Sequence, residues 1–307
     1  MVGAGYLGRF HAQKYASEAG CRLVAVADPR PEAREALALE LGTTAVADHR
    51  ELLGKVDAVS VVTTTPAHFA IARDFLEAGA HVLVEKPITE TVEQARELIT
   101  IAARCGRILQ VGHLERFNPA IVAAESELVG ARFIDCQRLA PFKERGTDVN
   151  VVLDLMIHDI DIVQSIVGRP IESIDAVGTP VFSGAVDIAN ARLRFEGGCV
   201  ANVTASRVSL KMERKLRVFR GDAYLSIDLQ QRILTVIRKQ ATPPAPGGLP
   251  VAIDERSFEQ GDALRAEIHS FLDCIATGRA PVVGGEDGLR ALETAIRITR
   301  LLQGDRP

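Results

Sequence analysis

The sequence predicts an α/β protein of two parts: a parallel sheet flanked by helices, then an α+β part with a large, open, mostly antiparallel sheet. Up to about residue 115, short apolar runs alternate with helical patterns of ten or more residues, which is typical of βαβ units. Beyond that point, alternating apolar–polar runs follow one another directly. The chain has 307 residues, more than one domain usually holds. We therefore expect domains over 1–115 and 116–307, with the last helix packing back on the first domain.

The first part reads as strands over 22–27, 56–62, 80–84 and 108–111, and helices over 7–18, 31–41, 67–77 and 91–103. Pro31 suits the first turn of its helix. Only Met1 and Val2 precede the first glycine, roughly four or five residues fewer than a buried strand needs. Either the start codon is miscalled or the sequence is trimmed; otherwise we expect the central strand to be a stub.

The second part predicts an antiparallel sheet with helices on one face. Strands are expected near 131–139, 171–180, 186–195, 199–208, 214–220, 223–228 and 232–238, and helices over 119–128, 151–166, 262–277 and 285–303. The Pro/Gly-rich stretch 242–248 predicts a surface loop. The alternation over 171–238 predicts an apolar sheet face that a second subunit would cover, so we expect a homodimer or homotetramer.

Composition excludes several classes of function. A net charge of −4 and the lack of a basic run argue against a nucleic-acid partner. No apolar stretch approaches the ~18 residues that span a bilayer, so we expect no membrane insertion. The five cysteines are scattered and include no C-x-x-C, which is typical of reduced cytoplasmic thiols.

The glycine loop Gly3-Ala4-Gly5-Tyr6-Leu7-Gly8 has the G-x-G-x-x-G spacing of a dinucleotide site. Asp28, twenty positions beyond Gly8, follows the second strand, where a carboxylate accepts hydrogen bonds from ribose hydroxyls and repels a 2′-phosphate. NAD is therefore favoured, although Arg30 leaves NADP open, and a surface carboxylate remains the alternative for Asp28. The expected cofactor contacts here are Gly3, Gly5, Tyr6, Leu7, Gly8, Asp28 and Arg30.

Two further segments lie at carboxyl ends of parallel strands, where open α/β sheets bind ligands. Thr63, Thr64, Thr65 and Pro66 follow one strand, and their hydroxyls and amides can line the cofactor. His68 is either a contact or a helix-start histidine. Glu85-Lys86-Pro87 ends another strand. Lys86 there predicts a fixed positive charge beside a reacting hydroxyl, able to stabilise an alkoxide; the alternative is a surface lysine.

Asp154 and His158 are spaced i, i+4 on an expected helix, with Asp161 three residues further on the same face. A carboxylate that orients an imidazole is the arrangement of a general base. The same cluster is also compatible with a metal or with a structural helix face. Because no further Cys or His lies close in sequence, we expect no metal site.

With these motifs and the terminal stretch Ala266-Glu267-Ile268-His269-Ser270-Phe271, the chain resembles the Gfo/Idh/MocA oxidoreductases along essentially its whole length. The resemblance implies a Rossmann domain followed by an α/β domain, NAD(P), and oxidation or reduction of sugar and polyol hydroxyls. It also implies that Lys86, Asp154 and His158 are catalytic, and that Glu85, Lys86 and Pro87 border the cofactor.

Within that family, the segments at 111–119 and 148–161 resemble the UDP-N-acetylglucosamine 3-dehydrogenases, which supply a 3-keto sugar to an aminotransferase in lipid A biosynthesis. Ordinary members carry a glycine-rich segment ahead of the Asp-x-x-x-His helix. This chain has Thr147-Asp148-Val149-Asn150 there instead. Arg116 is expected near the nicotinamide. His113, Asn118, Asp148 and His158 are expected near the sugar.

The predicted activity is NAD-dependent oxidation of a nucleotide-sugar hydroxyl. One alternative is a dehydrogenase of a free sugar or inositol. Another, from a different class, is an inactive NAD-binding sensor or scaffold, which the intact catalytic set argues against.

Overall fold

The structure is a computed structural model that describes residues 1–143, 149–241, 250–259 and 261–304. The chain divides into two compact units. The first comprises Met1–Leu114 and Asp262–Leu292, and the second Glu115–Gly261 and Glu293–Pro307. The unit changes between Leu114 and Glu115, and the segment Asp262–Leu292 belongs with the first unit.

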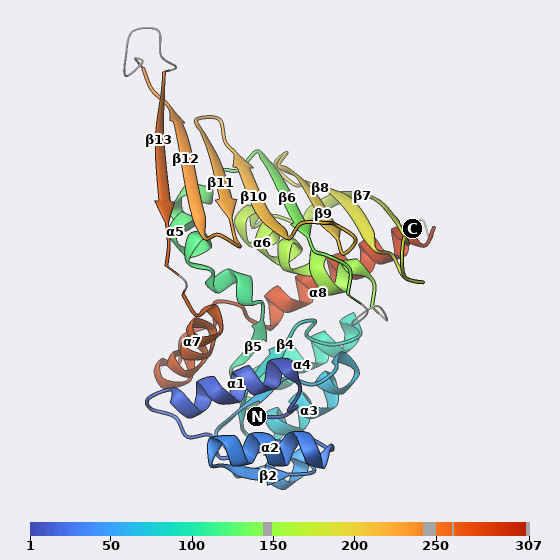
Figure 1. The fold of residues 1–307 in the computed structure, drawn as a ribbon, viewed down its shortest axis with the longest axis vertical. Helices are drawn as coiled ribbons and strands as arrows, with labels where there is room; N and C mark the ends of the chain where they lie inside the picture. The colour runs from blue at the N-terminus through green and yellow to red at the C-terminus, as the bar shows by residue number, and fades with distance from the viewer. Residues whose placement is uncertain (144–148, 242–249, 260, 305–307) are drawn as a thin grey trace. The chain divides into compact units, whose positions relative to one another are not determined.

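The first unit is a parallel sheet with helices. Strands β1 (Ala25–Ala27) and β2 (Thr44–Val46) pair with each other, and β3 (Ala58–Val61), β4 (His81–Glu85) and β5 (Leu109–Gly112) form a second set in that order (Figure 1). Its helices are α1 (Tyr6–Ser17), α2 (Pro31–Leu41), α3 (Thr65–Glu77), α4 (Val92–Cys105) and α7 (Ala263–Thr277). Short 3-10 segments lie at η1 (His49–Leu52) and, at the boundary, η2 (Leu114–Phe117).

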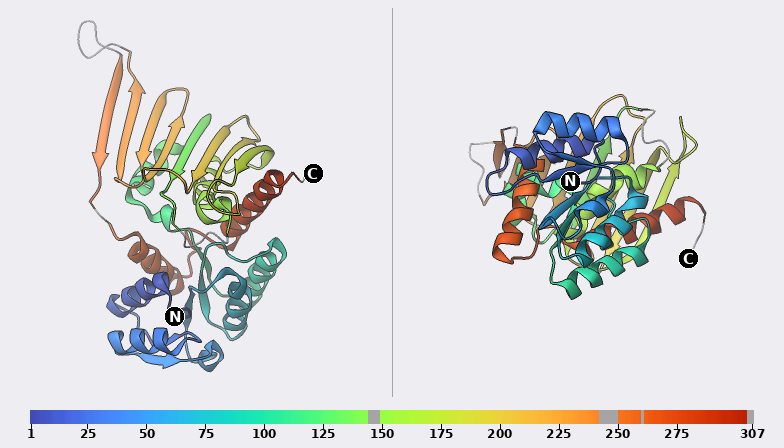
Figure 2. Two further views of the ribbon diagram at one scale, coloured as in Figure 1. Left: turned by 45° about the vertical axis from the view of Figure 1, so that its right-hand side comes forward. Right: turned by 90° about the horizontal axis from the view of Figure 1, so that it is seen from below.

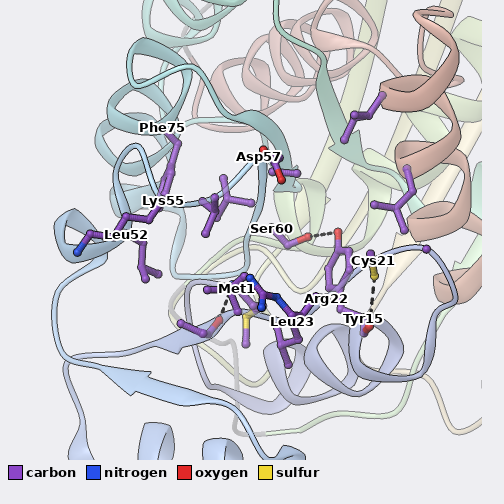
Figure 3. Close-up of a pocket in the computed structure, with 18 of the residues that line it drawn as sticks. Met1, Tyr15, Cys21, Arg22, Leu23, Leu52, Lys55, Asp57, Ser60 and Phe75 are labelled. Atoms are coloured by element: carbon purple, nitrogen blue, oxygen red, sulfur yellow. Dashed lines mark hydrogen bonds between the residues drawn. The ribbon is translucent and has the colours of Figure 1, made fainter.

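Met1 and Val2 form the stub of a central strand. Val2 bridges β1 through Ala27 and β3 through Val61, which joins the two sets of strands into one sheet. A cavity of about 380 Å³ adjoins the stub, lined by Met1, Tyr15, the segment before β1 and the start of β3 (Figure 3). The Met1 amino group donates to the Ala25 carbonyl at 3.0 Å, and burial lowers its pKa to about 5. The two residues therefore already make the hydrogen bonds of a parallel strand.

The second unit is built on one eight-stranded sheet in the order β13-β12-β11-β10-β6-β9-β8-β7 (Figures 1 and 2). Only the β6–β9 contact is parallel. The strands are β6 (Phe133–Leu139), β7 (Ile171–Thr179), β8 (Ile188–Phe195), β9 (Val200–Ser206), β10 (Glu213–Phe219), β11 (Ala223–Asp228), β12 (Ile233–Lys239) and β13 (Val251–Ser257). The helical segments are α5 (Pro119–Leu128), η3 (Val152–Met156) and α6 (Ile157–Val167), while α8 (Gly285–Leu302) runs from the first unit into the second.

Helices α5 and α6 cover one face of this sheet. The cross-strand row Ala201, Ile134, Val218, Leu225 and Val236 is fully buried on that face. The neighbouring positions point to the other face, where Phe219 and Ile253 are exposed. The open, mostly antiparallel sheet expected from the sequence is thus confirmed.

Two strands, β2 and β13, were not predicted from the sequence. β2 has one exposed and two half-exposed residues, and β13 carries Asp254, Glu255 and Arg256 at a sheet edge. The predicted loop over 242–248 lies outside the described residues. Within the described ranges, no helix combines the length and the apolarity that crossing a membrane requires.

Candidate active site

The glycine loop has the geometry of a phosphate site. Gly3 has φ +100°, and a Cβ on it would lie 2.3 Å from the Val62 carbonyl oxygen. A Cβ on Gly8 would lie 1.7 Å from the Gly3 oxygen, so only glycine allows this close packing of helix and strand. At Gly5 a Cβ would meet nothing within 4 Å, and α1 begins there without a side-chain cap. A helix start with glycine at the N-cap position lets the backbone approach an anion such as a pyrophosphate.

Asp28 is held against this loop. It is only 5 % exposed, and its Oδ2 accepts a hydrogen bond from the Ala4 N–H at 2.7 Å. Arg30 donates to both carboxylate oxygens at 3.1 Å. Burial opposes ionisation of Asp28, but the hydrogen bonds from Arg30 and Ala4 outweigh it and hold the pKa of the carboxyl below its ordinary value. The two residues predicted to choose between NAD and NADP are therefore partners in one ion pair.

The threonine segment follows β3 as predicted. Thr64 is the N-cap residue of α3, and Thr65 and Pro66 form its first turn. His68 is 1 % exposed; its Nδ1 lies 2.9 Å from the Pro87 carbonyl oxygen and its Nε2 lies 3.1 Å from that of Thr63. Burial lowers the pKa of this imidazole. His68 thus joins the loops after β3 and β4 in the first turns of α3, and its contact with the cofactor stays a prediction.

Lys86 directly follows β4, at the carboxyl end of the parallel sheet. The residue is half-buried, and its peptide bond to Pro87 is cis. The Lys86 N–H donates to Glu85 Oε2 at 3.3 Å. Glu85 is buried beneath it, and its Oε1 lies 3.1 Å from Nε2 of His11 on α1. The side chain of Glu85 therefore supports the backbone at Lys86 from inside the unit.

Asp154 and His158 lie on consecutive helical segments of the second unit. Asp154 belongs to the π-helical turn η3 and His158 to the first turn of α6, and both are half-buried. Asn150 starts this run, since its Oδ1 accepts hydrogen bonds from the N–H groups of Val152 and Leu153. The helix predicted over 151–166 is present, with a π-turn where a regular α-helix was expected. Such turns occur frequently at functional sites.

Several residues predicted as contacts make hydrogen bonds within the protein. Asn118 is 7 % exposed and caps α5: its Oδ1 accepts from the Ala120 N–H at 3.1 Å, and its Nδ2 donates to the Leu229 carbonyl at 2.9 Å. The sugar contact expected of Asn118 stays a prediction. Arg116 donates to Asp161 on α6 at 3.4 Å. His113 is buried after β5, and Asp148 lies outside the described residues.

A buried ion-pair network holds α6 to the sheet. Arg138 of β6, 3 % exposed, donates from Nε and Nη2 to both oxygens of Asp159 at 2.8 and 3.0 Å. Its Nη1 donates to Glu115 at 2.9 Å, and Arg214 donates to the same Glu115 oxygen at 3.1 Å. Asp159 is the neighbour of His158, so this pair fixes the turn that carries the histidine. No local sequence signal predicts this network, because its members are far apart in the chain.

A compact set of potential metal ligands lies elsewhere than at Asp154, His158 and Asp161. Among the residues that the structure describes, one group of three potential ligand side chains has its ligand atoms within 4.8 Å of one another, and that group is His11, Glu85 and Glu267.

Comparisons with known proteins agree with this geometry. Residues 1–113 match the family model for oxidoreductases with an NAD-binding Rossmann fold, and residues 121–223 match the GFO/IDH/MocA C-terminal domain. The UDP-N-acetylglucosamine 3-dehydrogenase of Acidithiobacillus ferrooxidans is 39 % identical over 97 % of this chain and 95 % of that protein. A crystal form of that enzyme superposes with a TM-score of 0.93 at 38 % identity, covering 99 % of this chain and 96 % of the other.

More distant relatives act on inositols. The scyllo-inositol 2-dehydrogenase (NAD⁺) of Bacillus subtilis is 27 % identical over 100 % of this chain and 94 % of that protein. The scyllo-inositol dehydrogenase of Lactobacillus casei, solved with NAD(H) and scyllo-inositol, has the same fold, with a TM-score of 0.82 at 21 % identity over 99 % of this chain and 96 % of the other.

The glycine loop, the buried Asp28 and the open parallel sheet define an NAD-binding oxidoreductase. The chain belongs to the GFO/IDH/MocA family of oxidoreductases, as the matches to both of its domains show. The predicted family, fold class, cofactor and enzymatic class are thereby confirmed.

Proposed function

We propose that this protein oxidises the 3-hydroxyl of UDP-N-acetylglucosamine to a ketone with NAD⁺. The observation that carries the proposal is the 39 % identity to a UDP-N-acetylglucosamine 3-dehydrogenase along nearly the whole of both chains. The inositol dehydrogenases that align with 91 % or more of this chain are 25–28 % identical, which makes a free inositol or sugar the second candidate.

The glycine loop and the start of α1 would hold the pyrophosphate of the dinucleotide, and Asp28 its ribose hydroxyls. The open side of Gly5 and the uncapped helix start support this assignment. NAD⁺, when bound, supplies the hydride acceptor for the oxidation.

The chemistry left to the protein is removal of the hydroxyl proton and control of the developing charge. We assign the proton transfer to His158 and its orientation to Asp154. The ammonium group of Lys86 would stabilise the alkoxide as the proton leaves. The π-turn at Asp154 and the fixation of α6 through Asp159 support a precisely held histidine.

The product would be a 3-keto sugar nucleotide, which an aminotransferase can convert to a 3-amino sugar for lipid A biosynthesis. We place this step in the cytoplasm. A coupled assay of the purified protein with such an aminotransferase should yield an amino sugar nucleotide. If unreacted ketone accumulates instead, the oxidation has occurred but the amination has not.

We also propose that a second copy of the chain covers the open face of the large sheet. Directly paired residues form an apolar row across that face: Val200, Phe133, Phe219, Tyr224, Ile237 and Ile253. Phe219 stacks near Phe133 and Tyr224 at ring distances of 5.5 and 4.9 Å. Light scattering should give the mass of a dimer or tetramer, and Phe219→Glu should lower it. A monomer at micromolar concentration would refute this assembly.

A further inference from the structure

A cluster of three ionisable side chains inside the first unit has no place in the proposed reaction. His11 of α1 and Glu267 of α7 are fully buried, and Glu85 at the end of β4 is 8 % exposed. Their potential ligand atoms lie within 4.8 Å of one another. Three separate elements therefore bring one imidazole and two carboxyl groups to a single interior point.

The hydrogen bonds of this cluster are incomplete. His11 Nε2 lies 3.1 Å from Glu85 Oε1, but both carboxyl oxygens of Glu267 and Nδ1 of His11 are buried without a hydrogen-bond partner. A buried carboxyl group without a hydrogen-bond partner destabilises the folded protein, because it has lost its hydrogen bonds to water and formed none in the interior. Among the described residues, no N–H or O–H group donates to either carboxyl oxygen of Glu267, whereas Glu85 accepts the Lys86 N–H and contacts His11.

The balance of charge also favours a cation at this cluster. Glu85 and Glu267 place two carboxyl groups beside one imidazole in the interior. Both can be ionised there only when positive charge balances them; otherwise one of them takes up a proton. A divalent cation would balance both of them and leave the imidazole neutral, as a metal ligand must be.

The spacing also suits a metal. Ligands at about 2.1 Å from a tetrahedral ion lie about 3.4 Å from one another. The His11–Glu85 separation of 3.1 Å is near that value, and a ligand atom of Glu267 lies within 4.8 Å of both. One imidazole with two carboxylates is a donor set for a first-row transition metal such as Zn²⁺.

We propose that His11, Glu85 and Glu267 bind one divalent transition-metal ion inside the Rossmann unit. The ion would tie α1 and α7 to the end of β4. Because Glu85 Oε2 accepts the Lys86 N–H, it would also fix the backbone that carries Lys86. Its role would be to stabilise and position this unit.

The test uses the full-length protein after chelator treatment, in a buffer without phosphate. Co²⁺ should bind in a 1:1 ratio with a visible d–d absorption, and Zn²⁺ should displace it. Saturating Zn²⁺ should raise Tm by at least ~3 °C, since a ligand bound only to the folded state stabilises it. Glu267→Gln, which keeps the size of the side chain, should lower Co²⁺ affinity at least about 10-fold, as should His11→Gln.

His269→Gln is the matched control, because His269 is exposed on the same helix two positions beyond Glu267. This variant should bind Co²⁺ like the unaltered protein. The proposal is overturned if the unaltered protein shows neither the absorption nor the rise in Tm. It is equally overturned if Glu267→Gln binds Co²⁺ as tightly as the control. Should Glu267→Gln fail to fold, the spectrum of the unaltered protein decides the question by itself.

Discussion

Replacing Arg138 with methionine should destabilise the second unit strongly, because it removes the cation between two buried carboxylates. Asp159 would lose both of its hydrogen bonds from the guanidinium, at 2.8 and 3.0 Å. Glu115 would keep the one from Arg214. The loss therefore corresponds to one broken buried ion pair, and we expect a decrease of about 3–5 kcal/mol in the free energy of unfolding.

The matched control is Arg217→Met on the neighbouring strand β10. Its ion pair with Asp135 has a similar distance, 2.9 Å, but both side chains are about a quarter exposed, at 29 and 24 %. Exposed pairs contribute about 0–1 kcal/mol. Urea unfolding at pH 7.5, followed by circular dichroism, gives both values. A loss below about 1 kcal/mol for Arg138→Met, equal to the control, would refute the reasoning.

The same pair of variants has a predicted pH dependence. Burial already raises the pKa of Asp159, and the neighbouring Arg138 opposes that rise. Without Arg138, the folded-state pKa of Asp159 should rise further above its unfolded value. Such a carboxyl group destabilises the fold once it ionises. The loss of unfolding free energy in Arg138→Met should therefore be smallest at low pH. It should grow as the pH rises through the folded-state pKa of Asp159. A deficit that is independent of pH would show that the lost contacts are not electrostatic.

The remaining predictions concern the cofactor and the catalytic set. Gly8→Ala should abolish NAD binding in calorimetry while the second unit stays folded, because its Cβ would lie 1.7 Å from the Gly3 oxygen; unchanged affinity would contradict the loop geometry. Asp28→Ala should narrow the preference for NAD over NADP in kcat/KM, and a wild type that prefers NADP would contradict the role given to this carboxylate. Lys86→Met should lower kcat by roughly two to three orders of magnitude with NAD still bound. His158→Asn should act similarly and remove the acidic limb of the pH–rate profile. Near-normal turnover in both folded variants would place the chemistry elsewhere.

Much of the fold could be predicted because its signals are local. The glycine loop, the apolar runs and the helix patterns gave the order of nearly every element. The two missed strands are short or charged, and tertiary pairing overrides their weak propensity. Contacts between distant segments, such as Arg138 with Asp159 or His11 with Glu85, leave no signal in a single sequence.

Asn118 shows a different limit. The pair Asn118-Pro119 is itself a helix-start signal, with an N-cap asparagine before proline at the first helical position. Local chemistry alone therefore predicts its capping role. The π-turn at Asp154 could not be predicted, because the apolar pattern around it fits an ordinary α-helix.

The most direct test of the proposed function is NAD⁺ reduction by the purified protein with a panel of UDP-sugars, free inositols and glucose. An aminotransferase or a ketone reagent should be present, so that an unfavourable equilibrium does not hide the product. We predict NADH formation with UDP-N-acetylglucosamine and a ketone at C3 of its sugar. Turnover of a free inositol or glucose but of no UDP-sugar would contradict the account and favour the polyol dehydrogenases among its relatives.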